Sequence, residues 1–316
     1  MSSLKLFLRS FLPFIIAVPL LLGVEQVLSI SWTFIAIVAG INVILAVSLN
    51  VVNGFTGQFS IGHAGFMAVG AYTAAKITTA MHGLQIVGLS AGMSDQVVFF
   101  GALVAGMVLA GLAGLVVGMP SLRLRGDYLA IVTLGFNEII RVIIENTPFL
   151  GQATGISGLP RLTSVMWVGM GVVATVVMAR RLVGSTHGRA LLAIREDEIA
   201  AEAMGVDTTR AKLRAFVLAS LFPAVAGGLY AFRLSYVDPS SAFPAAYEIQ
   251  VILMAIFGGA GTVFGPLAGG ILLAALGEAL WARFAELHLL LFGLIIVIVL
   301  RYMPEGLLAL LRRRVA

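Results

Sequence analysis

Apolar residues dominate the chain in long runs that short polar stretches separate. A helix of about 20 apolar residues is long enough to cross the hydrocarbon core of a bilayer, so each run is a candidate membrane span. The pattern predicts about ten segments, of which the eighth is short. They are residues 11–30, 32–52, 59–81, 96–119, 128–146, 164–182, 213–235, 247–258, 263–281 and 287–303. The expected fold class is all-α: a polytopic integral membrane protein whose segments include short or broken helices.

The first apolar segment, residues 11–30, has two interpretations. Lys5 and Arg9 precede it, as basic residues precede both signal peptides and first membrane helices. No convincing small-x-small cleavage site follows the segment. We therefore expect it to be retained as a helix.

Basic residues gather on alternate loops, which sets the expected orientation. With an inner N-terminus, the loops near 120–127 and 182–212 and the C-terminus all fall on the cytoplasmic side. Most of the basic residues lie there: Lys5, Arg9, Arg123, Arg125, Arg180, Arg181, Arg189, Arg195, Arg210, Lys212, Arg214, Arg301, Arg312, Arg313 and Arg314. Lys76, Arg141, Arg161, Arg233 and Arg283 lie elsewhere. Both termini are therefore predicted to be cytoplasmic.

Composition agrees with a lipid environment. Hydrophobic residues make up 60% of the 316 residues, charged residues 11%, and the mean hydropathy is +1.05. A soluble domain carries about 25% charged residues, so a water-exposed shell is excluded. The net charge of +5 is distributed as membrane topology requires, and no nucleic-acid partner is expected. With no cysteine, a disulfide framework and a thiolate metal site are also excluded.

Motifs for catalysis are missing from the sequence. Its only lysines, Lys5, Lys76 and Lys212, do not follow a glycine, so there is no phosphate-binding loop of the P-loop kind. Neither a zinc-protease motif nor a nucleophile elbow occurs, and the four histidines are scattered. We expect no catalytic residue, no metal site and no cofactor in this chain.

A cluster of polar residues and glycines interrupts the apolar pattern between residues 50 and 65. Broken helices at membrane depth are tolerated where they line a cavity, so the cluster is a candidate for the translocation path or a hinge. Alternatively, its polar side chains cap a helix end and join neighbouring helices, with His63 bonded to a backbone carbonyl. The candidate residues are Asn53, Gly54, Gly57, Gln58, Ser60, Gly62 and His63.

A second glycine cluster spans residues 257–266, and Gly258, Gly259 and Gly261 are its candidate hinge or path residues. Gly261, Gly265 and Gly269 recur every four residues, which favours close helix packing on one face. The same run is a poor continuous helix, so a break or short re-entrant segment is the alternative.

Charged residues inside predicted spans are few. Glu138, Arg141 and Glu145 follow Asn137 and share one helical stripe, which favours an internal ion pair over a substrate contact. Glu248 and Glu278 stand near span ends, and we interpret them as interfacial or packing residues.

The longest polar interruption, between Arg180 and Arg214, contains a predicted short surface helix from Arg195 to Met204 that stops at Gly205. Its small residues would let it seat in a groove of a partner, while the alternative is a solvated connecting helix. The residues expected to dock are Glu196, Asp197, Glu198, Ala200, Ala201, Glu202, Ala203 and Gly205.

Four stretches resemble one family, the LivM-type permeases of bacterial branched-chain amino acid ABC importers. They are SLNVVNGFTGQFSIGHAGF at 48–66, RLRGDYLAIVTLGF at 123–136, STHGRALLAIREDEIAAEAMGVDTTRAKLRAF at 185–216 and IFGGAGTVFGPLAGG at 256–270. The resemblance covers nearly the whole chain in order. It implies one permease domain over residues 1–316, with a cytoplasmic coupling loop at about 182–212.

The resemblance also implies partners: a homologous LivH-type permease, two cytoplasmic ATPase subunits that bind ATP and Mg²⁺, and a periplasmic substrate-binding protein. The loop helix would be similar to the coupling helix that sits in the ATPase groove, with Gly205 matching the glycine of the importers' Glu-Ala-Ala signature. The chain departs from that signature, because Ile199 stands six positions before Gly205 and Glu198 one residue earlier.

By this resemblance the expected function is the import of branched-chain or other hydrophobic amino acids across the bacterial inner membrane. Relatives that import urea, short amides or aromatic acids share these motifs, so those substrates are alternatives. An ion-coupled secondary transporter is a competing class, for which the Glu138–Arg141–Glu145 stripe is the only candidate coupling group. A membrane scaffold without transport activity is a third.

Overall fold

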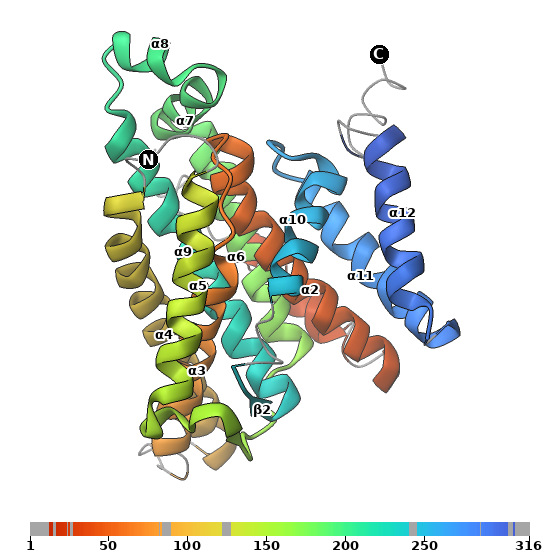
Figure 1. Ribbon diagram of the computed structural model, residues 1–316. Helices are drawn as coiled ribbons and strands as arrows, with labels where there is room; N and C mark the ends of the chain where they lie inside the picture. Colours follow the sequence, from red (N-terminus) through yellow and green to blue (C-terminus); the bar gives the residue numbers. More distant parts are fainter. Residues whose placement is uncertain are drawn as a thin grey trace, which may run out of the picture.

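The computed structural model describes residues 13–14, 17–23, 25, 28–81, 83, 90–121, 128–239, 245–284, 286–302 and 306. Most of these residues are helical, as Figure 1 shows. The α-helices are α2 (Ile30–Asn50), α3 (His63–Met81), α4 (Ala91–Ser121), α5 (Tyr128–Asn146), α6 (Val165–Gly184), α7 (Thr186–Glu196), α8 (Glu198–Ala203), α9 (Thr208–Leu234), α10 (Ala245–Gly259), α11 (Gly265–Arg283) and α12 (His288–Tyr302). A π-helix, η1 (Val51–Phe55), extends α2.

Four of the described helices are long and apolar enough to cross a membrane: Ile30–Phe55, Ala91–Ser121, Val165–Gly184 and Thr208–Leu234. Two shorter apolar helices, Tyr247–Gly259 and Gly265–Leu280, accompany them. The predicted all-α membrane class is confirmed, whereas the count of about ten segments stays a prediction.

Parts of the sequence predictions fall outside the described residues. Of the first predicted span, residues 13–14, 17–23, 25 and 28–30 are described; residues 13–14, 17–23 and 25 are helical, whereas residues 28–29 are not. The side chain of Leu21 lies against Gly169 of α6, so this segment packs on the helices that follow. Residues 1–12, 122–127 and 307–316, with the basic residues predicted to orient both ends of the chain, lie outside the described residues.

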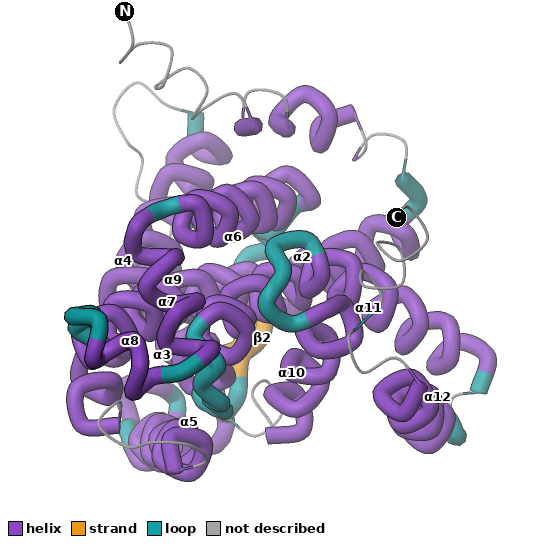
Figure 2. The backbone as a smooth tube through the Cα atoms, turned by 90° about the horizontal axis from the view of Figure 1, so that it is seen from above, coloured by secondary structure: helices purple, strands orange, loops and turns teal. Residues whose placement is uncertain are grey.

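The helices pack in two groups that α2 connects. Helices α3, α4 and α9 pack on one another, and α2 contacts α9 and α6 on one side and α10 and α11 on the other. In Figure 2, which shows the molecule from above, α12 lies at the periphery, and it contacts α11 and α10. The centre of the core is formed by fully buried side chains such as Ile41, Leu45, Met67, Phe99 and Phe232.

The two ends of the molecule are built differently, as Figure 1 shows. Helices α7 and α8 cap one end. At the other end, β1 (Ile156–Ser157) pairs antiparallel with β2 (Tyr236–Val237), beside the 3₁₀-helices η2 (Pro148–Leu150) and η3 (Gln152–Thr154). Residues 147–163, which lie between two predicted apolar segments, therefore have local structure of their own.

Glycines let α3 and α9 touch through their backbones. A Cβ atom built on Gly70 of α3 would overlap the backbone of Ala224, and one built on Gly227 of α9 would overlap the carbonyl of Met67. Such contact without intervening side chains is typical of membrane helices. The α3–α9 pair therefore has no room for even a methyl group.

Replacing Gly70 by alanine is expected to destabilise the folded protein. Overpacking against backbone costs about 1–3 kcal/mol or more, because a helix must move to make room. The matched control is Gly101→Ala on α4, where nothing lies within 4 Å of the added Cβ atom. Thermal unfolding in detergent should show a lower midpoint for Gly70→Ala only, and equal midpoints would contradict the close packing.

Candidate functional site

The first glycine-rich break follows directly from α2. The π-helix η1 ends at Phe55, residues 57–62 are irregular, and α3 begins at His63. Gly57 has φ +68°, a conformation that glycine adopts without strain. The predicted span 59–81 is therefore a shorter helix that begins inside the molecule, since Gly65 lies beside Asn137 in the middle of α5.

Side chains from neighbouring elements satisfy the backbone of this irregular segment. Asn53 accepts a hydrogen bond from the N–H of Ser60 (3.1 Å) and donates one to its carbonyl (3.3 Å). From α5, Thr133 accepts from the N–H of Ile61 (2.9 Å), and Asn137 donates to its carbonyl (2.7 Å). An unpaired backbone group in lipid costs several kcal/mol, so these amides and hydroxyls allow the helix to break at membrane depth.

Glu248 of α10 caps the start of α3. Its two carboxylate oxygens accept hydrogen bonds from the backbone N–H groups of His63 (3.1 Å) and Ala64 (2.5 Å). The Glu248 side chain is buried, so of its two interpretations the interfacial one is wrong and the packing one agrees with the structure. A negative group at a helix N-terminus is favourable electrostatically as well as through these bonds.

The other predicted path residues lie in or beside this segment. The His63 ring is buried, and neither ring nitrogen makes a hydrogen bond of normal geometry with the described residues, although the Ser48 carbonyl lies near it. Gln58 is half-buried and donates its backbone N–H to Val52. A Cβ atom on Gly62 would lie 3.0 Å from that of Thr133, so this glycine allows α5 to approach.

The second break is the turn between α10 and α11. Gly259 and Gly261 have φ values of +118° and +78°, and Thr262 ties the turn by donating its hydroxyl to the Gly259 carbonyl (2.8 Å). The predicted close packing and the predicted break are both present, at different residues. Gly265 and Gly269 pack against the backbone of α10, including Gly258, whereas Gly261 lies in the turn and not on the face of α11.

Asn50 joins the two breaks. Its side-chain oxygen accepts from the N–H of Gly261 (2.8 Å), and its amide donates to the carbonyl of Thr262 (2.8 Å). A Cβ atom on Gly54 would lie 2.5 Å from the Gly261 nitrogen, so only glycine fits here. Two segments that the sequence showed as separate candidates therefore form one site.

Arg195, near the end of α7, rests on both breaks. Its Nη1 donates to the carbonyl of Gly54 (3.0 Å). The Arg195 side chain also leaves no room for a Cβ atom on Gly261, and its Cγ would lie 3.1 Å from one on Gly57. The helical loop at the end of the molecule is thus in direct contact with the glycine-rich breaks.

The predicted loop helix is two helices in the structure. α7 ends at Glu196, Asp197 is extended (φ −156°, ψ 110°), and its Oδ1 accepts from the N–H groups of Ile199 (2.9 Å) and Ala200 (3.0 Å) to start α8. The short polar side chain of Asp197 competes with a continuous helix by bonding the following backbone. A single helix from Arg195 to Met204 is therefore wrong.

The predicted stop at Gly205 is confirmed. Gly205 has φ +86°, and its N–H donates to the carbonyl of Glu202 (2.9 Å). The N–H of Val206 donates to the carbonyl of Ala201 (3.1 Å). This pair of bonds is the Schellman arrangement of helix ends, which favours glycine.

Helix α8 is anchored on one side and open on the other. Glu198 forms an ion pair with the buried Lys212 of α9 (2.6 Å), and Ala201 is buried. These two predicted docking residues therefore hold α8 in place. The remaining predicted docking residues, Glu196, Asp197, Ala200, Glu202, Ala203 and Gly205, are exposed, as are Ile199 and Met204.

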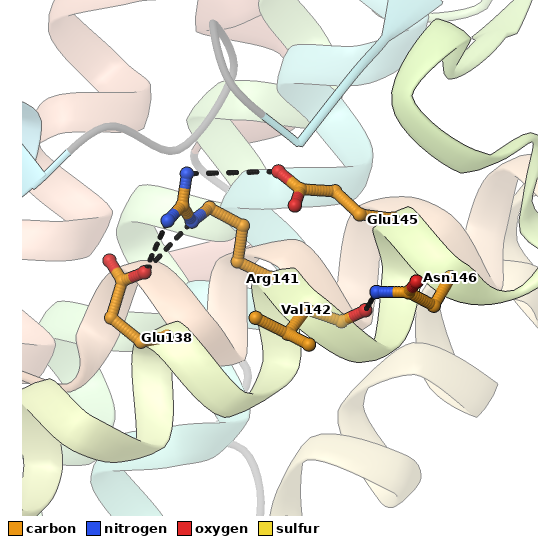
Figure 3. A network of polar contacts seen from close by, with 5 residues as sticks. All are labelled: Glu138, Arg141, Val142, Glu145 and Asn146. Atoms are coloured by element: carbon orange, nitrogen blue, oxygen red, sulfur yellow. Dashed lines mark hydrogen bonds and ion pairs between the residues drawn. The ribbon is translucent and has the colours of Figure 1, made fainter.

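The predicted pairing of Arg141 with Glu138 in α5 is confirmed, but the pair is not in the interior of this chain. Arg141 donates from Nε to Glu138 (2.9 Å), pairs with it through Nη2 (2.6 Å), and lies 3.7 Å from Glu145 through Nη1, as Figure 3 shows. The three side chains remain 45%, 49% and 30% exposed in the order Arg141, Glu138, Glu145. Within the described ranges, no group of three or more His, Asp or Glu side chains is placed to hold a metal ion.

A bundle of apolar helices, several of them long enough to cross a bilayer, is the architecture of a multi-pass membrane protein. The profile of the branched-chain amino acid transport system permease component matches residues 31–300. The chain belongs to this permease family.

Relatives support the family assignment. The high-affinity branched-chain amino acid transport system permease protein LivM of Escherichia coli K12 is 34% identical over 329 residues, covering 90% of this chain and 74% of LivM. A probable LivM of Methanocaldococcus jannaschii is 27% identical, covering 68% and 70%. The permease protein LivH of Escherichia coli K12 is 24% identical, covering 84% and 90%.

Proposed function

We propose that this chain is a permease subunit of an ATP-driven importer and that it passes branched-chain or other hydrophobic amino acids through the membrane. Its membership of the permease family and its similarity to LivM support this function. Import of urea, short amides or aromatic acids is the alternative within the same family.

The proposed assembly contains a homologous LivH-type permease, two cytoplasmic ATPase subunits that bind ATP and Mg²⁺, and a periplasmic binding protein that delivers the amino acid. Similarity of this chain to both LivM and LivH supports pairing of two related permeases. The chain itself performs no catalysis. It forms one permease domain of about ten segments in the bacterial inner membrane, with both termini and the α7–α8 end cytoplasmic.

The contact of Arg195 with the carbonyl of Gly54 carries the proposed mechanism. The exposed side of α8 docks on an ATPase subunit, and movement of α8 reaches α7 and then the two breaks. Breaks with glycine at positive φ allow the backbone to rearrange, and Asn50 makes them move together. The path then alternates between outward-open and inward-open states.

Reconstitution of the whole importer in proteoliposomes tests the function. Uptake of leucine, isoleucine or valine should require ATP hydrolysis, the second permease and the loaded binding protein. Competition with urea, amides and aromatic acids identifies the substrate class. Uptake that is driven by a proton gradient without any ATPase would overturn the proposal and favour a secondary transporter.

Replacing Ala203 by tryptophan is expected to weaken ATPase binding, because its small side chain lies on the exposed side of α8. A bulky residue in a tightly packed interface costs about 1–3 kcal/mol, or roughly tenfold to a hundredfold in affinity. The control is Ala153→Trp, exposed in η3 at the other end of the molecule. Copurification of the ATPase at graded concentrations measures the effect, and equal binding by both variants would contradict docking at α8.

A further inference from the structure

We propose that one stripe of α5, formed by Leu134, Glu138, Arg141 and Glu145, lines the water-filled translocation path, where the charged residues hold the ammonium and carboxylate groups of the amino acid. This inference rests on the proposed import function. It assigns a specific surface and a substrate chemistry to the path between the two permeases.

The charges of the stripe lie on an otherwise apolar part of the helix surface. Helix α5 exposes apolar side chains around it, including Ile131 (65%), Ile139 (57%) and Ile143 (55%). Among them, Glu138 and Arg141 remain about half exposed on a helix that is predicted to span the membrane. Charges that face lipid are costly even when paired, and such residues normally face a bundle interior or a water-filled cavity. The stripe therefore faces something other than lipid.

The stripe also lies beside the first break. A small cavity of about 20 Å³ is lined by Glu138, Arg141 and Leu134 of α5 together with Ala64 and Gly65 at the start of α3. This volume holds about one water molecule, so it is a recess and not a complete amino acid site. Asn137, the residue before Glu138, accepts from the N–H of Gly65 (2.6 Å). Rearrangement of the break would therefore reshape the recess.

The three charged side chains offer groups that can bind an amino acid. Glu138 takes the Nε and Nη2 side of the Arg141 guanidinium, whereas Nη1 lies 3.7 Å from Glu145, beyond hydrogen-bond distance. That edge can donate to a substrate carboxylate, which Arg recognises well. One Arg and two Glu residues leave a surplus negative charge, which can receive an ammonium group. A zwitterionic amino acid supplies both charged groups, whereas urea has neither a carboxylate nor an ammonium group.

Cysteine labelling tests the inference, because the chain has no native cysteine. Leu134→Cys places a thiol in the stripe without removing a charged residue, and Ile139→Cys on the same helix is the matched control. A charged, membrane-impermeant methanethiosulfonate reagent is applied to the assembled importer, with the unsubstituted importer as background. A thiol in water ionises and reacts, whereas one in lipid has a raised pKa, so Leu134→Cys should react roughly tenfold faster or more.

Two further readouts separate the outcomes. The loaded binding protein, with the ATPases trapped by vanadate, should change the labelling rate at Leu134→Cys. Arg141→Gln should lower amino acid uptake more than Arg141→Lys, which keeps a positive charge. Equal, slow labelling of both cysteines while the unsubstituted importer transports normally would overturn this inference alone. Absence of ATP-dependent uptake by the unsubstituted importer would instead overturn the proposed function.

Discussion

Replacing Arg195 by alanine is expected to abolish most amino acid uptake while the importer remains assembled and hydrolyses ATP. The substitution removes the charge-assisted hydrogen bond to the Gly54 carbonyl and the side chain that packs on Gly57 and Gly261. Such a bond is worth about 1.5–3 kcal/mol, which corresponds to roughly a tenfold to hundredfold loss if it couples α7 to the breaks.

The measurement is the number of amino acids imported per ATP hydrolysed in proteoliposomes. Arg189→Ala is the matched control, because it removes another exposed arginine from the same helix and leaves the bond between Arg195 and Gly54 in place. Its ratio should stay close to that of the unsubstituted importer. A normal ratio for Arg195→Ala would show that ATPase movement reaches the path by another route, and the proposed role of Arg195 would be abandoned.

The positions of the helices could be predicted because a segment that crosses lipid must be both apolar and helical. Each described helix from α2 to α6 and from α9 to α12 overlaps a predicted apolar segment. The largest differences are at helix ends. α9 begins at Thr208, five residues before the apolar run, because Asp207 caps it by accepting from the N–H of Arg210 (3.0 Å). A polar first turn is invisible to hydropathy but follows from capping chemistry.

The candidate site could be predicted only in pieces. Glycines indicated both breaks, and amide side chains indicated the first, yet Asn50 and Gly261 are 211 residues apart, and no local pattern shows that they meet. Arg195 was one of many basic residues explained by membrane orientation, so its contact with Gly54 had no separate signal. Lys212 was likewise explained by membrane orientation, so its burial and its ion pair with Glu198 had no separate signal in the sequence. Long-range contacts of this kind depend on helix packing, which the sequence pattern leaves open.

Glu248 also makes a long-range contact that the sequence pattern did not show, and its replacement is expected to cause a large loss of stability. A single glutamate near the end of a short apolar run resembles an interfacial residue, but its carboxylate is buried against the start of α3. Replacing it by alanine would leave the N–H groups of His63 and Ala64 without their acceptor. Each unsatisfied buried group costs about 1–3 kcal/mol, so about 2–6 kcal/mol of stability is expected to be lost, with a further loss from the helix dipole.

The Glu248→Ala protein is expected to give little monodisperse importer after purification, with a thermal midpoint well below that of the unsubstituted protein. Glu248→Gln keeps one carbonyl acceptor but points an N–H₂ group at the second backbone N–H, so its midpoint should lie between the two. Glu278→Ala on α11 is the matched control, since it removes another glutamate from an apolar helix. If Glu248→Ala were as stable as Glu278→Ala, α3 would not depend on this cap, and the break would need another source of stability. If the ordering holds, α10 fixes the start of α3, and movement of the α10–α11 turn must also move the first break.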